Sequence, residues 1–459
     1  MICPRERPIH DIHPDRIFSG LAFAPSRPVV AAVSGGSDSM ALLVLLDAFF
    51  RNRGRLDGLV AVTVDHGLRA ESAGEAARVE AFCACRSIAH RIVRWQGDKP
   101  SSGVPAAARE ARHRLLAETA GSLGASMVLT GHTANDQAET IAMRRERGAG
   151  RGLAGIAPAT LYCGATWFAR PLLAQSRTAL RAVLASAGHS WIDDPSNENA
   201  AYERARTRQT LAVGGDGAVE RLLEQGRLAA NERIDAGRRA ARLIERHADL
   251  VAPGLIRVDA ALLSAGDATA ARLAFRLLLS AVGGREHLPD ADRARDLFER
   301  LTAAPGRGSL GGAVADRRRG ALYLHRELRA GWTDAAPAVA GAAWDGRFRI
   351  AARDLPANTI VKAAGKALAV DRAREFEGGA APAALVRAAL ASEPTLHVSD
   401  ADNDLGRHVP AGSEGIFQRV PAPYARYLPS FDLAPAEALR MLLGCDDFPV
   451  SPWDSHNDA

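Results

Sequence analysis

Along the first two hundred residues, the distribution of hydrophobic and polar positions shows two patterns that follow each other repeatedly. Residues 28–33 form an uncharged run rich in Val and Ala, as a buried parallel strand does. Residues 40–46 are apolar and mostly unbranched at Cβ, which favours a helix. The pattern repeats in expected strands at 59–64, 88–95 and 126–130 and in expected helices at 71–85, 105–121 and from Asp136 onward. We therefore predict an α/β fold with a doubly wound parallel sheet.

The rest of the chain has a different pattern. Residues 219–246 interleave charges with Ala and Leu, which is typical of an exposed helix that joins domains. Residues 256–330 are typical of a small helical domain that finishes in a strand, and a Gly/Ala/Pro-rich linker follows at 335–343. We expect three parts: the α/β domain at 1–215, a helical domain at 216–333 and a mixed α+β region at 344–450.

Composition narrows the class of protein. The chain has 459 residues, 47% of them hydrophobic, and no apolar run approaches the roughly 20 residues of a membrane-spanning helix. The first residues carry charges with no apolar signal core behind them, and an odd count of five cysteines fits a reducing compartment. We expect a cytoplasmic globular protein without a membrane partner. The net charge of +5 is compatible with a nucleic-acid partner but does not require one.

The most informative stretch joins the first strand to the first helix and reads Ser-Gly-Gly-Ser-Asp-Ser. Backbone N–H groups at a helix start, together with the helix dipole, favour an anion such as phosphate. The two glycines let a ligand touch bare backbone, and the serines add hydroxyl donors. The carboxylate of Asp38 would repel phosphate unless a cation lay between them, which suggests Mg²⁺. The alternative is a small-residue turn without a ligand. The candidate nucleotide-binding residues are Ser34, Gly35, Gly36, Ser37, Asp38 and Ser39.

Two further turns, Asp65-His66 and Gly131-His132, directly follow expected strands. Ligands of such sheets bind outside the carboxyl ends of the strands, so both turns are expected to meet the first loop in one crevice. The first turn would hold the adenine or ribose of a nucleotide, and the second would contribute to the same site. The alternative for the first turn is a simple strand end, with residues 72–75 as the capping box of the next helix.

Asp136 and Glu139 are a pair of acids three residues apart at a helix start, which places both carboxylates on one face. Paired acids beside a triphosphate can bind Mg²⁺ or take a proton from a nucleophile. The alternative is an N-cap residue followed by a solvated Glu. Because a phosphate loop is expected beside them, we favour the functional interpretation.

Arginines are the candidate ligands for phosphate or RNA. Arg109 and Arg112 share one face of a predicted helix, where a forked guanidinium suits phosphate, although an exposed basic helix is an equally good explanation. His113 between them is interpreted as an ordinary surface histidine. A turn-rich segment at 191–197 leads into a second basic stretch that contains Arg204, Arg206 and Arg208. It is expected to close over the site or to meet RNA, and the alternative is a domain-boundary loop.

These stretches, taken in order, resemble the tRNA(Ile)-lysidine synthetase family of the pyrophosphate-loop ATPase superfamily. The matching strings are SGGSDS, DHGLRAESAGEA, REARHR, GHTANDQAET, RPLL and WIDDPSN. The first is shared across the superfamily, whereas the other five together are specific to the family. They cover roughly the first two hundred residues, and little resemblance remains beyond about residue 330.

The resemblance implies an enzyme that uses ATP and Mg²⁺ to adenylate the cytidine at the first anticodon position of a CAU-bearing tRNA(Ile). It then attaches free L-lysine, and AMP and pyrophosphate are released. The first domain would be the pyrophosphate-loop catalytic domain, the helical domain would bind tRNA, and the C-terminal region would contact it. The oligomeric state is left open, with a homodimer as one option.

The resemblance also implies roles for individual residues. Asp38, Asp136 and Glu139 form the acidic centre, in which we assign Asp38 to the metal and the other two to recognition or deprotonation of the lysine amine. Arg112 joins them as a catalytic residue that serves phosphate. The residues assigned to tRNA or phosphate binding are Arg109, Arg204, Arg206 and Arg208.

The chain departs from the family pattern around the acidic pair. Asn135 stands where an acid is common, and Arg145 and Glu146 occupy positions that are usually apolar. The glycine-rich loop at 148–152 is one residue short. These differences leave the packing of the helix after Glu139 open.

Two rival functions remain. A tRNA thiolase of the same superfamily would need a persulfide-carrying cysteine or an iron–sulfur site near the loop. Cys83 and Cys85 form Cys-x-Cys without a second pair, which argues against a zinc or iron–sulfur centre. The other rival is an arginine-rich RNA-binding protein without activity, against which the complete set of acids argues.

Overall fold

In the computed structural model the described residues are 12–68, 71–148, 150–193, 203–214, 216–318, 320–328, 335–351, 355–376, 378–379, 381–400, 403–408 and 415–453. The chain divides into two compact units, which we describe separately. The first comprises Met1–Arg233 with Pro429–Phe431 and Pro449–Ala459, and the second comprises Ile234–Leu428 with Asp432–Phe448.

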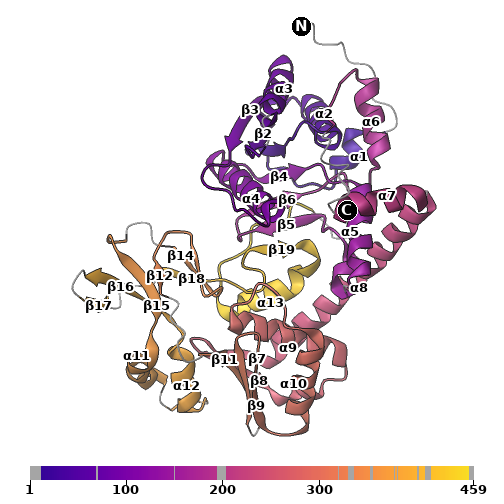
Figure 1. Ribbon diagram of the computed structural model, residues 1–459. Coiled ribbons are helices and arrows are strands. Elements are labelled where there is room, and N and C mark those ends of the chain that lie inside the picture. Colours follow the sequence, from indigo (N-terminus) through magenta and orange to yellow (C-terminus); the bar gives the residue numbers. More distant parts are fainter. Residues whose placement is uncertain are drawn as a thin grey trace. The chain divides into compact units, whose positions relative to one another are not determined.

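The first unit is built on a mostly parallel sheet that contains the strands β5-β6-β4-β1-β2-β3 in this order (Figure 1). These strands are β1 (Val29–Ala32), β2 (Leu59–Asp65), β3 (Ala89–Arg94), β4 (Met127–Thr130), β5 (Ala159–Tyr162) and β6 (Thr166–Ala169). The division of the chain falls within β19 (Tyr427–Pro429), of which only the last residue belongs to the first unit. The strands β6, β4, β1, β2 and β3 run parallel, and β5 returns antiparallel beside β6. The carboxyl ends of β1, β2, β4 and β6 therefore lie at one edge of the sheet.

Helices follow the parallel strands. They are α1 (Pro14–Phe18), α2 (Ser37–Arg51), α3 (Ser72–Cys85), α4 (Val104–Ser122), α5 (Ala134–Glu146), α6 (Arg177–Ser186), α7 (Glu203–Gly214) and the first part of α8 (Asp216–His247). The apolar run Met40–Leu46 of α2 is buried completely, and α2 packs against β1, β2 and α6. The predicted α/β fold is confirmed, while the short β5–β6 hairpin and the helices α6 and α7 were not predicted.

The helix α5 packs normally despite its departures from the family pattern. Its buried residues Ala138, Ile141 and Ala142 form one cluster with Leu222 of α8. A Cβ on Gly226 of α8 would lie 2.4 Å from Ile141 Cδ1, so glycine allows the two helices to approach closely. Both Arg145 and Glu146 are exposed at the end of α5, where an apolar side chain is not needed.

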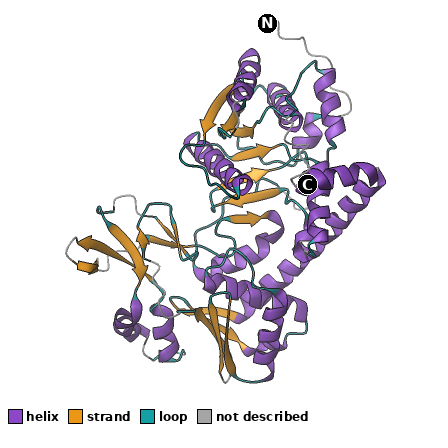
Figure 2. Cartoon of the chain, viewed as in Figure 1, coloured by secondary structure: helices purple, strands orange, loops and turns teal. Residues whose placement is uncertain are grey.

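The second unit contains three sheets, which Figure 2 shows as orange strands. The largest has the order β7-β8-β11-β10-β9 and is antiparallel throughout. Its elements are β7 (Ala248–Ala252), β8 (Leu255–Asp259), β9 (Gly306–Leu310), β10 (Ala313–Arg318) and β11 (Ala321–Arg326), with the helices α9 (Ala268–Gly283) and α10 (Ala291–Ala303). The region expected to be a helical domain therefore holds a complete sheet, of which the sequence pattern showed only the last strand.

The other two sheets are small and lie mostly in the expected α+β region, although the strand Ala336–Pro337 and the first residue of the strand Ala343–Trp344 fall within the expected linker at 335–343. One has the order β12-β15-β16-β17 and the other β13-β14-β18. Their elements are β12 (Ala336–Pro337), β13 (Ala343–Trp344), β14 (Phe348–Ile350), β15 (Thr359–Ala363), β16 (Pro394–Asp400), β17 (Asn403–His408) and β18 (Phe417–Arg419), with α11 (Gly365–Arg372), α12 (Ala383–Leu390) and α13 (Leu433–Leu443). Buried ion pairs join Arg326 to Asp345, Asp345 to Arg347, and Arg347 to Glu393, which ties the end of β11 to these sheets.

Among the described residues, every helix is too short or too polar to cross a membrane.

Gly131 offers a test of how closely the turn after β4 packs on α2. A Cβ built there would lie 2.8 Å from the backbone oxygen of Asp38, so Gly131→Ala must push the turn away from the first turn of α2. We expect the free energy of unfolding to fall by about 2 kcal/mol, measured by thermal denaturation. Gly121→Ala is the matched control, because nothing lies within 4 Å of a Cβ at that helical position. Equal melting temperatures for the two variants would contradict the close packing.

Candidate active site

The Ser-Gly-Gly-Ser-Asp-Ser loop is held in shape by its own hydroxyl groups. Ser39 Oγ donates to the Gly36 carbonyl oxygen at 3.0 Å and accepts from the Ser34 N–H at 3.1 Å. Gly35 has φ +87°, and its carbonyl oxygen accepts from the Ile192 N–H at 2.9 Å. The loop is thus a fixed turn directly before a 15-residue helix, which is a favourable place for an anion.

The acidic pair lies at the start of α5. This helix begins two residues earlier than expected, with Thr133 as N-cap residue. Asp136 Oδ2 accepts from the Thr133 N–H at 2.9 Å while the Asp136 N–H donates to Thr133 Oγ1 at 3.4 Å, which completes a capping box. The side chain of Glu139 is only 2% exposed. The alternative of a solvated Glu is therefore wrong, and capping uses only one of the two oxygens of Asp136.

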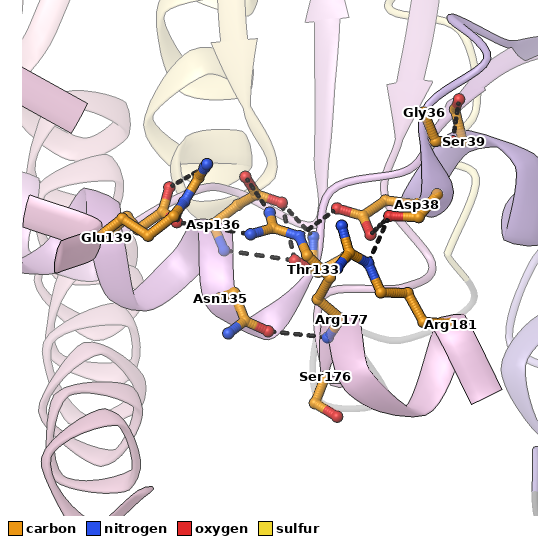
Figure 3. A network of polar contacts seen from close by, with 12 residues as sticks. Gly36, Asp38, Ser39, Thr133, Asn135, Asp136, Glu139, Ser176, Arg177 and Arg181 are labelled. Atoms are coloured by element: carbon orange, nitrogen blue, oxygen red, sulfur yellow. Dashed lines mark hydrogen bonds and ion pairs between the residues drawn. The ribbon is translucent and has the colours of Figure 1, made fainter. Parts of the chain in front are cut away.

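Arg177, the first residue of α6, connects the loop to the acidic pair (Figure 3). Its Nε donates to Asp38 Oδ2 at 2.9 Å, and its terminal nitrogens lie 3.5 Å from Asp136 Oδ1 and 3.8 Å from Glu139 Oε1. Burial lowers the pKa of Arg177, but the three carboxylates outweigh burial and raise its pKa. The Asn135 side-chain oxygen accepts from the Arg177 N–H at 2.8 Å, so the residue that replaces the usual acid fixes the start of α6.

The helix α7 supplies two more cations to the same acids. Arg204 binds Glu139 Oε2 through Nε at 2.8 Å and Asp136 Oδ1 through Nη2 at 3.0 Å. Arg208, one turn later, donates from Nε to Glu139 Oε1 at 2.7 Å. Arg206 lies between them on another face of the helix and is exposed. The structure therefore brings Arg204 and Arg208 to the acidic pair, whereas Arg206 lies on another face of α7.

Charge at the acidic centre is balanced in this state. Three carboxylates, from Asp38, Asp136 and Glu139, face three guanidinium groups, from Arg177, Arg204 and Arg208. An added anion would compete for the guanidinium groups, and an added cation would compete for the carboxylates. The centre can therefore bind an anionic group and an ammonium group together. The anionic group would pair with the guanidinium groups and free the carboxylates, and the ammonium group would pair with the carboxylates and free the guanidinium groups.

Arg112 on α4 is a fourth cation near this centre. Burial lowers the pKa of Arg112 to about 10, and the charges of Arg109 and Arg204 act in the same direction. Within the described part of the chain its guanidinium forms no ion pair or hydrogen bond, so a bound anion would relieve the repulsion. His113 is buried, not a surface residue, and its Nδ1 lies 2.8 Å from the Arg109 carbonyl oxygen in an ordinary helical contact.

The turn after β2 is rigid and partly polar. Asp65 Oδ1 accepts from the Gly67 N–H at 2.9 Å and from Ser72 Oγ at 2.8 Å, contacts that lower the Asp65 pKa. Glu71, not Ser72, precedes α3 as its N-cap residue, so the expected capping box is wrong. His66 Nδ1 is buried without a hydrogen-bond partner among the described residues, which leaves a polar atom for a ligand.

His132, in the turn after β4, is held by a hydrogen bond between its Nδ1 and Thr130 Oγ1 at 2.9 Å. Burial lowers the pKa of His132 well below its usual value, and it also lowers the pKa of His66. The positive charge of Arg112 acts on both rings in the same direction. Both turns therefore lie within electrostatic reach of Arg112, as expected for turns at one edge of the sheet. Arg69 and residues 194–202, including most of the turn-rich segment, lie outside the described residues.

Sequence reasoning missed Arg177. The signal was present, because Ser176 caps a helix whose apolar residues Leu180, Val183 and Leu184 recur at helical spacing. That helix follows β6, which is parallel to β4 and ends at the same edge of the sheet. The four-residue strand β6 was not predicted, so the fourth turn at this edge was overlooked.

Arg112 offers a test of anion binding at this edge. We expect Arg112→Ala to weaken the binding of inorganic pyrophosphate about tenfold or more, measured by calorimetry, because a charge-assisted hydrogen bond is lost. Arg114→Ala is the matched control, since Arg114 lies on the same helix and pairs with Glu118 at 3.0 Å. Equal pyrophosphate affinity in the wild type and the Arg112 variant would exclude Arg112 from the anion site.

Comparison with known proteins agrees with this geometry. Residues 12–213 match the model of the PP-loop domain family. A tRNA(Ile)-lysidine synthase of Mesorhizobium japonicum is 46% identical over 456 residues, covering 97% of this chain and 99% of that protein. Its counterpart in Rhizobium meliloti is 39% identical, covering 94% and 95%. The counterpart in Brucella ovis is 41% identical, covering 73% and 77%.

A solved structure, the U34-tRNA thiolase NcsA of Methanococcus maripaludis, is 16% identical with a TM-score of 0.40, covering 47% of this chain and 78% of that one. Such a distant likeness does not bear on function. The full-length relatives do: the chain belongs to the tRNA(Ile)-lysidine synthase family.

Proposed function

We propose that the chain ligates L-lysine to the cytidine at the first anticodon position of a CAU-bearing tRNA(Ile), with ATP converted to AMP and pyrophosphate. The observation that carries this proposal is the position of the three carboxylates beside a phosphate-binding loop, with Arg177 between them. This arrangement provides for an anionic nucleotide and a cationic amine at one place. A tRNA substrate implies a cytoplasmic location, and the homodimer stays a prediction.

In the first step the O2 oxygen of cytidine attacks the α-phosphate of ATP. The new bond is between O2 and phosphorus, and the bond between the α-phosphate and the bridging oxygen breaks, so pyrophosphate leaves. Backbone N–H groups at the start of α2 and the guanidinium of Arg112 stabilise the phosphate charge. Arg109 is exposed on the same helix and remains a proposed phosphate or RNA ligand, as does the exposed Arg206.

Mg²⁺ fits this site only together with ATP. Among the described residues no group of three or more metal-binding side chains is assembled. Mg²⁺ is commonly held by one or two carboxylates, substrate phosphates and water, and Asp38 in the loop sequence, in the first turn of α2, supplies such a carboxylate. A bound Mg²⁺ would neutralise charge on the phosphates. Asp38 would then bind the metal in place of Arg177.

In the second step the side-chain amine of lysine attacks C2 of the adenylated cytidine, and the bond from C2 to the O2 oxygen breaks as AMP leaves. Asp136 Oδ1 and Glu139 are the proposed partners of the lysine ammonium, because the other oxygen of Asp136 is used in the helix cap. They hold the ammonium group and accept the proton that the amine loses. Arg204 and Arg208 would move toward phosphate or RNA when lysine takes their place.

The thiolase alternative is poorly supported by Cys83 and Cys163. Cys83 is buried, and burial raises the pKa of its thiol to about 12, so it is a poor nucleophile. Cys163 lies in the turn from β5 to β6, at the edge of the sheet opposite the carboxyl end of β6. Neither cysteine is placed to carry sulfur to the loop.

Asp136→Asn tests the proposed reaction without removing the helix cap, since the amide oxygen can still accept from Thr133. We expect incorporation of labelled lysine into a CAU-bearing tRNA(Ile) transcript to fall about 100-fold or more, with little change in melting temperature. Asp15→Asn, at a 60% exposed position, is the matched control, and a methionine tRNA is the control substrate. Near-normal incorporation by the Asp136 variant would overturn its assigned role. Pyrophosphate release with no lysine incorporated in the wild type would overturn the proposed function.

The balance of charge at the acidic centre predicts coupling between the two substrates. A triphosphate competes for the guanidinium groups and frees the carboxylates, so we expect lysine to bind at least about fivefold more tightly when a non-hydrolysable ATP analogue is present. Arg177→Ala should bind lysine better without the analogue and gain less from it, as measured by calorimetry. Arg114→Ala is the control, because Arg114 pairs with Glu118 instead of the three acids. Equal lysine affinity with and without the analogue would contradict the coupling.

A further inference from the structure

The second unit contains a cavity of about 650 Å³ that the reaction described above does not use. One wall is the face of the sheet formed by β9, β10 and β11, and the other is formed by α11 and α12. Its volume lies within the range of small-molecule sites, roughly 300–1,000 Å³. All of these elements belong to the second unit, and Figure 1 labels β9, β11, α11 and α12.

Strand register explains which side chains line the sheet wall. His325 of β11 pairs with Val314 of β10, which pairs with Ser309 of β9, so these three side chains share one face. Arg307 of β9 lies two residues before Ser309, so its side chain is on the same face of the sheet. This is the face that α11 and α12 cover, because Tyr323, two residues before His325, packs in one cluster with Ala369 and Leu385.

His325 presents an unpaired acceptor at this wall. The residue is 3% exposed, and its Nδ1 is bonded to the Arg326 carbonyl oxygen at 2.9 Å, which requires the proton on Nδ1. Its Nε2 is buried without a partner among the described residues. Burial lowers the pKa of His325, so the ring is neutral and Nε2 accepts a hydrogen bond. A buried acceptor without a donor is costly, and a ligand hydroxyl group would satisfy it.

Three cations line the cavity. Arg307, Lys366 and Arg387 are exposed, and their side chains form no ion pair or hydrogen bond inside the described ranges. Glu327 is the carboxylate of the lining, while Arg326 is neutralised by Asp345 at 2.7 Å. The excess of positive charge favours an anionic ligand.

The rest of the lining is mostly apolar: Val314 and Leu328 come from the sheet side, and Val370 and three alanines come from α11, α12 and the end of α12. An inorganic anion would leave this surface uncovered, and an apolar molecule would leave the cations and Nε2 unused. The lining thus combines an anion site, an acceptor for a hydroxyl group and an apolar wall for a flat ring.

We propose that this cavity binds one nucleoside monophosphate unit, with its phosphate at the three cations, a ribose hydroxyl on His325 Nε2 and its base against the apolar wall. The unit is either a free nucleotide or an unpaired nucleotide of an RNA. The assignment is independent of the ligase reaction, because it rests on residues of the second unit alone.

The first test measures binding of guanosine 5′-monophosphate to the full chain by calorimetry, without ATP, lysine or Mg²⁺. We expect Lys366→Ala combined with Arg387→Ala to weaken binding about tenfold or more, because two charge-assisted contacts are lost. Arg293→Ala, an exposed arginine of α10 outside the cavity lining, is the control. Unchanged affinity in the double variant, or no binding to the wild type by either a nucleotide or an RNA, would overturn the proposal. Because no catalysis is measured, either result leaves the ligase reaction untouched.

The second test addresses the hydroxyl group without changing the protein. The 2′,3′-dideoxy nucleotide should bind the wild type about fivefold more weakly than its ribose form, and His325→Leu should abolish this difference. Equal affinity of both nucleotides for the wild type would overturn the role of Nε2, whether or not the His325 variant folds.

The third test separates the two sources of the ligand. A single-stranded hexanucleotide RNA that binds more tightly than the mononucleotide, and loses affinity in the double variant, identifies an unpaired RNA nucleotide. A mononucleotide that binds as tightly as the hexanucleotide identifies a free nucleotide. A blunt RNA duplex that binds as well as the single strand would overturn the proposal, because paired nucleotides cannot enter the cavity.

Discussion

The structure of the catalytic unit depends on the neutralisation of Glu139. This carboxylate is 2% exposed, and an unpaired charge at such a site would cost several kcal/mol. Its partners, Arg204 and Arg208, come from α7, about 65 residues later in the chain. The pairing therefore fixes where α7 lies against α5, and the apolar contact between α5 and α8 follows from the same arrangement. Arg177 extends the network to Asp38 and so couples the acidic pair to the phosphate loop.

Local patterns in the sequence were sufficient to predict the parallel core. The strand before the loop and the helix after it are uniformly apolar, because β1 is buried on both faces and α2 is enclosed by the sheet and α6. The sheet of the second unit could not be predicted in this way. Its strand β9 reads Gly-Arg-Gly-Ser-Leu and shows no alternation, because the strand lies at the edge of its sheet with most of its residues exposed.

The candidate site was predictable where a motif lies at a strand end and was not predictable where it depends on tertiary contacts. Asp38, Asp136 and Glu139 were identified because they lie in or beside recognisable turns. Arg204 and Arg208 were predicted as ligands of phosphate or RNA, but their present partners are the acids. No sequence spacing relates Arg177 to Asp38, which are 139 residues apart. Only the parallel order of β6, β4 and β1 brings them to the same edge.

Asp136 caps a helix, and in the proposed reaction the same side chain also binds the lysine amine. Its Oδ2 accepts from both the backbone N–H and the hydroxyl group of Thr133, while its Oδ1 faces Arg204 and Arg177. The helix cap fixes the carboxylate through backbone geometry, so its orientation does not depend on the substrate that replaces the arginines. A carboxylate fixed in this way needs no reorganisation when an ammonium group arrives, which is the condition for strong electrostatic stabilisation. The residue that most resembles an ordinary cap is therefore the one best prepared to bind the amine.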